Sequence, residues 1–128
     1  MVEFKNISYS YSKESGIYDI DLSVKDGEFC FLVGPTGSGK TSLLKMIYFD
    51  ILPSEGELDV LGYNSKKTKR AKIHKLRKKI GVIFQDYKLL QQRTLYENIA
   101  LPLHIYGVVR QKIKDNVEEA LELADLLD

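Results

Sequence analysis

The sequence predicts an α/β fold in which a parallel sheet carries a loop and a helix. Two short runs are continuously apolar, residues 29–33 and 80–84, and such runs are typical of strands buried on both faces of a parallel sheet. Near the C-terminus, apolar residues recur at helical spacing from 112 to 127, which predicts an amphipathic helix. The 128 residues are 44% hydrophobic and 29% charged, so we expect one compact domain with a core of its own.

The expected strands and helices each have a local signal. Strands are predicted at residues 2–11, 17–24, 29–33, 57–61 and 80–84, with polar turns at 13–16 and 25–27. Helices are predicted at 39–49, from 94 onward and at 112–127. Pro53 prevents the first helix from continuing, Thr94 and Glu97 form a capping box that starts the second, and Pro102 should kink it. The last helix reaches Asp128 without a glycine or polar cap, so we expect the sequence to be cut there.

The run from Gly34 to Thr41 matches the pattern G-x-x-x-x-G-K-[ST] of a phosphate-binding loop (P-loop) between a strand and a helix. Triphosphate oxygens must approach backbone N–H groups closely, which glycines without side chains permit. The helix start that follows favours negative charge. Lys40 is expected to reach the β- and γ-phosphates and Thr41 to offer its hydroxyl to Mg²⁺. The expected ATP-binding residues of this loop are Gly34, Pro35, Thr36, Gly37, Ser38, Gly39, Lys40, Thr41 and Ser42.

Charge is distributed unevenly although the net charge is only +1. Nine of the 19 basic residues lie between residues 66 and 79. The favoured interpretation is a solvated helix with Ile73 and Leu76 facing inward, and the alternative is attraction to an anionic membrane surface. No aromatic residues interleave with the basic run, so no nucleic-acid partner is expected. His74 and His104 have no partners at metal-ligand spacing.

Cellular location is indicated by the cysteine count and by the N-terminus. Cys30 is the single cysteine, which excludes an internal disulfide and favours a reducing compartment. Because Cys30 falls within the apolar run 29–33, we expect a buried, unreactive thiol. The N-terminus has no signal-peptide pattern, and no apolar run is long enough for a membrane span. We therefore expect a soluble, cytoplasmic protein.

Over all 128 residues the chain resembles the N-terminal portion of ABC-transporter nucleotide-binding domains. The resemblance is carried by the phosphate-binding loop, by Leu58-Asp59-Val60-Leu61-Gly62 and by Ile80-Gly81-Val82-Ile83-Phe84-Gln85. It implies an antiparallel β subdomain and an incomplete parallel sheet within residues 1–88, and the start of a helical subdomain within 89–128. Within the family, the runs 84–90 and 93–103 are most similar to FtsE-type cell-division ATPases.

The resemblance implies roles for two residues outside the loop. Gln85 follows an apolar strand, and the family places a glutamine here that contacts Mg²⁺ or the attacking water; a polar strand cap is the plainer alternative. Tyr11 ends the first strand, where the family places an aromatic side chain that stacks on adenine, and Tyr9 and Tyr18 are its competitors. We expect Lys40 and Gln85 to serve catalysis and Thr41 and Gln85 to serve the metal.

Function and partners also follow from the resemblance. It implies an ATPase that works as a full-length homodimer at the cytoplasmic face of the bacterial inner membrane, beneath an FtsX-type integral membrane protein. An ATPase of the lipoprotein-release or macrolide-export kind is one alternative, and a nucleotide-binding module without hydrolysis is another. The chain contains no Leu-Ser-Gly-Gly signature and no apolar strand that ends in Asp-Glu. We therefore expect the chain, made alone, to be inactive.

One apolar cluster suggests where a membrane partner would dock. Large apolar residues follow Gln85 in a region that otherwise resembles a loop: Tyr87, Leu89, Leu90 and Tyr96. Exposed apolar patches indicate partners, so we expect a groove that receives a cytoplasmic helix of the membrane protein. The alternative is that Leu89 and Leu90 pack under the helix that begins after Thr94.

Overall fold

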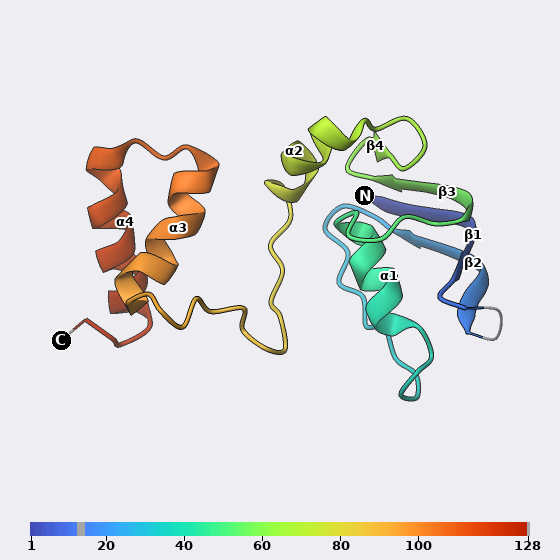
Figure 1. Ribbon diagram of the computed structural model, residues 1–128, viewed down its shortest axis with the longest axis horizontal. Coiled ribbons are helices and arrows are strands. Elements are labelled where there is room, and N and C mark those ends of the chain that lie inside the picture. Colours follow the sequence, from blue (N-terminus) through green and yellow to red (C-terminus); the bar gives the residue numbers. More distant parts are fainter. Residues whose placement is uncertain (13–14, 128) are drawn as a thin grey trace. The chain divides into compact units, whose positions relative to one another are not determined.

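A computed structural model describes residues 1–12 and 15–127 of the chain (Figure 1). The chain forms two compact units, residues 1–81 and 82–128. The predicted polar turn at 13–16 includes Lys13 and Glu14, which lie outside the described residues, as does Asp128. No helix among the described residues is both long and apolar enough to cross a membrane.

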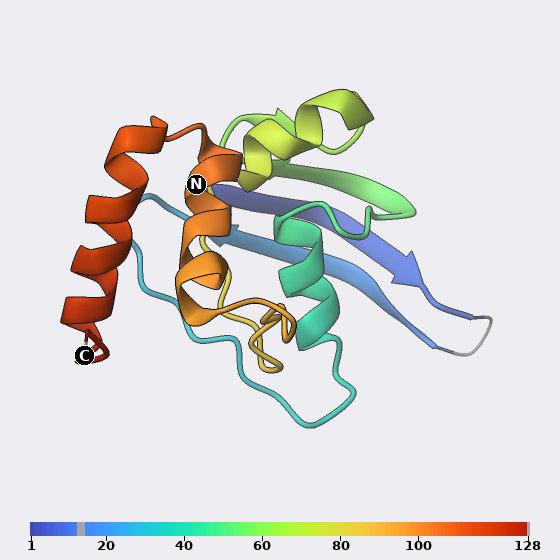
Figure 2. The ribbon, with the colours of Figure 1, turned by 60° about the vertical axis from the view of Figure 1, so that its left-hand side comes forward.

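The first unit is built on a four-stranded antiparallel sheet in the order β2-β1-β3-β4 (Figures 1 and 2). Its strands are β1 (Val2–Ser10), β2 (Gly16–Val24), β3 (Glu55–Val60) and β4 (Tyr63–Asn64). β1 lies in the centre, pairing Phe4 with Leu22 of β2 and with Leu58 of β3. The predicted strands 2–11, 17–24 and 57–61 are therefore confirmed within one or two residues, and so is the turn at Gly27, whose φ is 75°.

Helix α1 (Lys40–Ile47) packs its apolar side against this sheet (Figure 2). The shared core contains Phe4, Ile7, Ile17, Leu43, Met46, Phe49, Leu58, Val60 and Leu76. Met46 of α1 is fully buried, as are Ile7 and Leu58 of the sheet. Burial of one such side chain contributes about 1.5–3 kcal/mol, so this contact fixes α1, and with it the loop that precedes α1, on the sheet.

Helix α2 (Ile73–Arg77) follows a short 3₁₀ turn, η1 (Arg70–Lys72), and is anchored at two points. Its Leu76 is fully buried in the shared core, and Ile73 packs beside it. The Arg77 guanidinium donates from Nε to the Tyr48 carbonyl at 2.9 Å and from Nη2 to the Phe49 carbonyl at 3.0 Å. Arg77 thus pairs carbonyl groups that the end of α1 leaves without helical partners. The inward placement of Ile73 and Leu76 agrees with the sequence.

The second unit contains a pair of helices, α3 (Leu95–Tyr106) and α4 (Arg110–Leu123). They share a small core of Ala100, Ile113 and Val117, with Ile99, Leu103, Val108 and Leu121 partly buried around it. The predicted capping box is confirmed, because the Thr94 side chain accepts from the Glu97 N–H while the Glu97 side chain accepts from the Thr94 N–H. Pro102 lies within α3, and Gly107 ends it in the left-handed conformation.

The two apolar runs predicted as parallel strands are not strands in this structure. Residues 29–33 and 80–84 form no β-ladder, and within the described residues the sheet is antiparallel throughout. A parallel strand requires neighbours on its edges, and the described chain supplies none to either run. Phe29 is 82% exposed and Ile83 is 99% exposed. The prediction of a buried thiol is wrong for the same reason, because Cys30 is exposed.

Two helices end earlier than predicted. α1 ends at Ile47, not at Phe49, because Phe49 takes a left-handed φ of 54° and the Asp50 N–H bonds to the Lys45 carbonyl. α4 ends at Leu123 because Asp125 takes a φ of 57° and the Leu126 N–H bonds to the Leu121 carbonyl. Both are Schellman-type ends built without glycine. At the end of α4 the closing hydrogen bonds are made by the backbone N–H groups of Asp125 and Leu126.

Candidate functional site

The loop before α1 delivers several free backbone donors to one place. Gly39 precedes the helix at a left-handed φ of 91° and supplies no side-chain cap, and α1 has no acidic residue in its first turn. The first N–H groups of a helix have no intrahelical partner, and their partial positive charge favours an anion. The start of α1 is therefore available to an anionic ligand.

Lys40 places its ammonium group on the loop itself. Its Nζ donates to the Gly34 carbonyl at 2.8 Å and to the Pro35 carbonyl at 2.7 Å, and lies 3.5 Å from the Ser38 hydroxyl. These contacts close the loop into a ring around the lysine. The positive charge thus lies beside the same loop whose amides can bind an anion.

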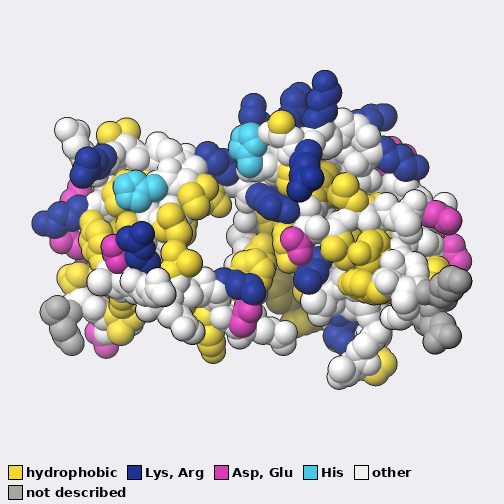
Figure 3. All heavy atoms as spheres, viewed as in Figure 1, with side chains coloured by type: hydrophobic (Ala, Val, Ile, Leu, Met, Phe, Trp, Pro, Cys, Tyr) yellow, Lys and Arg dark blue, Asp and Glu magenta, His cyan; other side chains and the backbone are white. Residues whose placement is uncertain are grey.

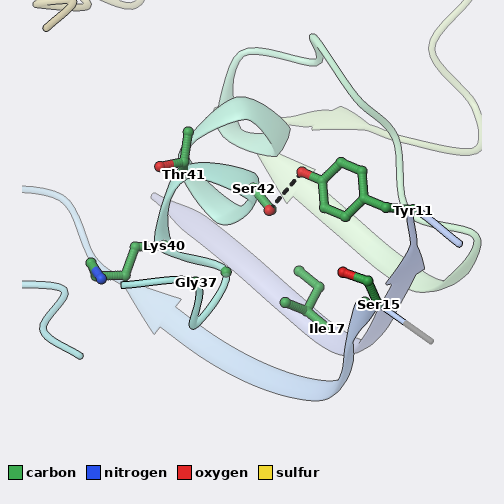
Figure 4. Close-up of a pocket in the computed structure, with 9 residues that line it drawn as sticks. Tyr11, Ser15, Ile17, Gly37, Lys40, Thr41 and Ser42 are labelled. Atoms are coloured by element: carbon green, nitrogen blue, oxygen red, sulfur yellow. Dashed lines mark hydrogen bonds between the residues drawn. The ribbon is translucent and has the colours of Figure 1, made fainter. Parts of the chain in front are cut away.

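A hollow of about 220 Å³ lies beside the start of α1 (Figure 4). It is lined by the end of the β1–β2 hairpin and by the phosphate-binding loop: Tyr11, Ser15, Gly16, Ile17, Gly37, Gly39, Lys40, Thr41 and Ser42. The hollow is smaller than the volume of about 300–1,000 Å³ that is usual for ligand pockets. Seven of the lining positions are polar residues or glycines, as phosphate and ribose groups require.

Tyr11 is held over the hollow from two sides. Its hydroxyl and the Ser42 hydroxyl form a 2.7 Å hydrogen bond, drawn as a dashed line in Figure 4. The Tyr9 ring meets the Tyr11 ring edge-on, with centroids 4.8 Å apart. Tyr11 remains 56% exposed, so one part of its ring stays accessible. Of the three competing tyrosines, Tyr11 is the one that lines the hollow, and neither Tyr9 nor Tyr18 is among the lining residues described.

Gly39 is required by its surroundings as well as by its backbone. A Cβ at this position would lie 2.2 Å from Cγ2 of Ile17, a residue of β2 that is almost fully buried. Gly37 has a similar φ of 82°, but a Cβ there would meet nothing within 4 Å. The two glycines therefore serve differently: Gly37 supplies a turn, whereas Gly39 lets the loop lie against the hairpin.

The donors of this loop fit a nucleotide triphosphate better than they fit a bare metal ion. No group of three or more His, Cys, Asp or Glu side chains among residues 1–12 and 15–127 could hold a metal. Thr41 offers one exposed hydroxyl at the start of α1, and Mg²⁺ in nucleotide sites takes its remaining ligands from phosphate and water. The amides and Lys40 can donate hydrogen bonds to phosphate oxygens, and the Thr41 hydroxyl can supply one oxygen ligand to Mg²⁺.

Gln85 lies in the second unit, where it is exposed in the turn 85–88. The next residues are fixed locally: Asp86 pairs with Lys88, whose hydrogen bond lowers the pKa of the Asp86 carboxyl. Tyr87, Leu89, Leu90 and Tyr96 are all exposed, between 41% and 78%. Leu89 and Leu90 are thus not buried under α3, contrary to the alternative interpretation.

Asn98 fixes this apolar segment to α3. Its side-chain Oδ1 accepts from the Leu90 N–H at 2.8 Å, and its Nδ2 donates to the Leu90 carbonyl at 3.2 Å and to the Thr94 carbonyl at 2.9 Å. A side-chain amide therefore pairs with both backbone groups of Leu90, as a neighbouring strand would. The segment is ordered by polar contacts while its apolar side chains stay exposed.

Sequence reasoning missed the hairpin wall of the hollow. Ser15, Gly16 and Ile17 line it because β1 and β2 pair Ser10 with Gly16, which sets the start of β2 opposite Tyr11. The signal was present in the sequence, since two adjacent strands joined by a short polar turn pair as a hairpin. The Tyr11–Ser42 hydrogen bond has no comparable signal, because it joins residues 31 positions apart.

Comparisons with known proteins agree with this geometry. A sequence model of the ABC transporter family matches residues 17–128. The cell division ATP-binding protein FtsE of Streptococcus pneumoniae is 37% identical over 127 residues, which cover 98% of this chain and 55% of that protein. The methionine import ATP-binding protein MetN of Clostridium acetobutylicum is 39% identical over 128 residues, covering 100% of this chain and 40% of that protein.

A solved structure is also similar, that of a dimeric post-hydrolysis state of the ATP-binding cassette MJ0796 bound to ADP and Pi. It matches with a TM-score of 0.84 and 32% identity, over 98% of this chain and 57% of that one. The chain spans about half the length of the curated relatives it matches.

Proposed function

Because this chain belongs to the ABC transporter family, we propose that residues 34–42 bind the phosphates of ATP and that Tyr11 stacks on the adenine. The observation that carries the proposal is the uncapped start of α1, with Lys40 on the loop beside it. Tyr11 supports the second half, because it is the tyrosine that lines the hollow. Stacking of a base on an aromatic ring contributes about 1–3 kcal/mol.

The loop residues have distinct proposed tasks. Backbone amides from Gly37 to Ser42 bind phosphate oxygens, and Lys40 exchanges its two carbonyl partners for the β- and γ-phosphates. Thr41 is the proposed ligand of Mg²⁺ on this loop. For Gln85, the family resemblance supports a catalytic role in orienting the attacking water. In the full-length homodimer, ATP hydrolysis follows from family membership; Mg²⁺, when bound, neutralises charge between the phosphates.

We propose a cell-division role beneath an FtsX-type membrane protein, at the cytoplasmic face of the inner membrane. The support is local: the runs 84–90 and 93–103 resemble FtsE-type ATPases, and they carry several exposed apolar side chains, those of Phe84, Tyr87, Leu89, Leu90, Leu95, Tyr96 and Leu101. This segment is the proposed docking groove for a cytoplasmic helix of the partner.

An importer role is the second candidate, because a MetN relative is as similar as FtsE, at 39% and 37% identity. Lipoprotein release or macrolide export is a third candidate, and nucleotide binding without hydrolysis is a fourth.

Lys40→Ala in the full-length protein tests the nucleotide site. We expect ATP binding or hydrolysis to be lost, because no other cation lies on the loop among the described residues. Binding is measured by titration calorimetry and hydrolysis by phosphate release. Lys25→Ala, which removes an exposed lysine outside the hollow, should change neither. Unchanged hydrolysis in the Lys40→Ala protein would refute the proposal.

The 128-residue chain made alone should not turn over ATP. Lys40, Thr41 and the amides can hold phosphates, but in-line attack also needs a group that positions or activates water and groups that stabilise charge at the γ-phosphate. Loss of one such preorganised group costs about 3–4 kcal/mol in activation energy. Phosphate release by the purified monodisperse chain should equal that of its Lys40→Ala version. Turnover clearly above that control would show that the chain suffices for catalysis.

A further inference from the structure

A second surface of the first unit concentrates positive charge. Residues 66–79 contain nine Lys and Arg and no Asp or Glu, a charge of +9, while the other 114 residues carry ten Lys and Arg against 18 Asp and Glu, a charge of −8. Figure 3 shows these side chains gathered over α2 and β4. We define the basic surface as the exposed basic residues of this run other than Arg77 and Lys79: Lys66, Lys67, Lys69, Arg70, Lys72, Lys75 and Lys78.

The charges of the basic surface are not neutralised within the unit. None of the seven side chains forms an ion pair with any residue that the structure describes. Two carboxylates on the neighbouring strand β3 have other partners: Glu57 accepts from the Asn64 side chain at 2.6 Å, and Asp59 accepts from the Gly62 N–H at 3.1 Å. Like charges three or four residues apart on a helix destabilise it. The surface therefore lowers stability unless an external anion binds it.

The basic surface stands on a fixed support. Leu76 is fully buried, Arg77 bonds to the carbonyls of Tyr48 and Phe49, and the Lys79 ammonium lies 5.4 Å from the centre of the Tyr63 ring. These three contacts use the inward side of the segment and leave the lysines on the outward side. An anionic partner would meet charges that are already held together, so little backbone entropy is lost on binding.

We propose that the basic surface binds the anionic phospholipid headgroups of a membrane leaflet. A leaflet presents many negative charges in a plane and needs no shape-specific contact, which suits lysines spread over η1, α2 and the preceding turn. Sequence-tolerant binding of single-stranded nucleic acid uses exposed aromatic rings, and the run 66–79 contains no Phe, Tyr or Trp. The proposal goes beyond the nucleotide site and does not depend on it.

Co-sedimentation of the intact protein with lipid vesicles tests the proposal. Vesicles containing phosphatidylglycerol are compared with vesicles of phosphatidylcholine alone. The test variant carries Lys67→Gln, Lys72→Gln and Lys75→Gln, and the charge-matched control carries Lys25→Gln, Arg110→Gln and Lys112→Gln, which are also exposed. Each well-placed basic residue strengthens binding to an anionic leaflet by about five-fold, so the test variant should bind about 100-fold more weakly. The control variant should bind the vesicles as the parent does, and added salt should weaken the binding of the parent to the anionic vesicles.

Three outcomes would overturn the proposal. The first is equal binding of the parent protein to both kinds of vesicle. The second is an equal loss of vesicle binding in the test and control variants. The third is a test variant that binds a DNA or RNA oligonucleotide more weakly than the parent does but binds vesicles equally well. Circular dichroism and ATP binding should be unchanged in both variants, since none of the six residues lines the hollow. If the parent protein binds ATP but does not bind anionic vesicles, the lipid proposal alone is wrong. If the parent protein does not bind ATP, the proposed nucleotide site is wrong instead.

Discussion

Helices α1 and α3 begin in opposite ways. α3 is closed by its own side chains: Thr94 and Glu97 form a reciprocal capping box, and Arg93 pairs with Glu97 at 3.0 Å. α1 begins after Gly39, which has no side chain to accept a hydrogen bond from the first N–H groups, and its first turn contains no acidic residue. The helix starts differ in what completes them, because α3 supplies its own carboxylate whereas α1 leaves its amides to an anion from outside.

The contrast extends to how each helix is held. α1 lacks a cap but packs Leu43 and Met46 into the larger core, which holds it in place. α3 has a cap, but among its described residues only Ala100 is buried. Capping therefore contributes to stability in α3, while in α1 tertiary packing replaces it and frees the helix start for binding.

Gly39→Ala should have the largest effect. A Cβ in the left-handed region costs about 1–2 kcal/mol, and its clash with Ile17 adds about 1–3 kcal/mol of overpacking. We expect an unfolding free energy lower by about 2–5 kcal/mol in urea titration, together with loss of ATP affinity in calorimetry.

Two matched variants separate strain from the clash. Gly37 and Gly62 have φ angles of 82° and 79°, and a new Cβ at either position would meet nothing within 4 Å. Backbone strain alone should therefore lower the unfolding free energy of Gly37→Ala and of Gly62→Ala by about 1–2 kcal/mol. Gly62→Ala, in the turn between β3 and β4, should keep its ATP affinity. An equal loss of stability in all three variants would mean that contact with Ile17 does not shape the loop.

Thr94→Ala should weaken α3 without touching the nucleotide site. Removal of a threonine cap costs about 0.5–2 kcal/mol, and Thr94→Ser, which keeps the hydroxyl, should cost less. The unfolding free energy and the ATP affinity are measured on the same samples. A fall in ATP affinity as large as that of Gly39→Ala would contradict the division between the two helices.

The smallest effect concerns pH. The Thr94 N–H, followed by Arg93, lowers the pKa of Glu97 from its ordinary value of 4.5. A lowered folded pKa means that the carboxylate stabilises the fold above the ordinary value and that this contribution is lost as pH falls through the lowered one. Thermal unfolding should therefore depend less on pH below 4.5 in Glu97→Gln than in the parent. Glu119→Gln, which replaces another exposed glutamate of the same unit, is the matched control.

Local signals predicted the elements that local chemistry decides. The hairpin strands, α1 and the Thr94–Glu97 box follow from alternation, spacing and capping over a few residues. The runs 29–33 and 80–84 could not be settled in this way, because an apolar run becomes a parallel strand only when other strands pair with it. The left-handed ends at Phe49 and Asp125 were also missed, since Phe rarely adopts that conformation and Asp adopts it only occasionally.

The candidate site was predictable to a similar degree. The pattern at 34–41 located the loop, and the hollow beside α1 is lined by Gly37, Gly39, Lys40 and Thr41 of that pattern. The pattern did not indicate that Ile17 crowds Gly39 or that Ser42 holds the Tyr11 hydroxyl. Both depend on how the hairpin packs against α1, which is long-range packing that single-sequence reasoning does not reach.

The position of Lys40 has a consequence for the heat of binding. Its ammonium already donates to two carbonyls of its own loop, at 2.8 and 2.7 Å. A phosphate therefore replaces existing hydrogen bonds instead of meeting a hydrated cation, and the measured enthalpy is the difference between two bonded states. The freed carbonyls of Gly34 and Pro35 must find new donors, so some of the favourable phosphate enthalpy is cancelled within the loop. Affinity at this site then depends on how easily the loop gives up its own lysine as well as on how strongly it holds the nucleotide.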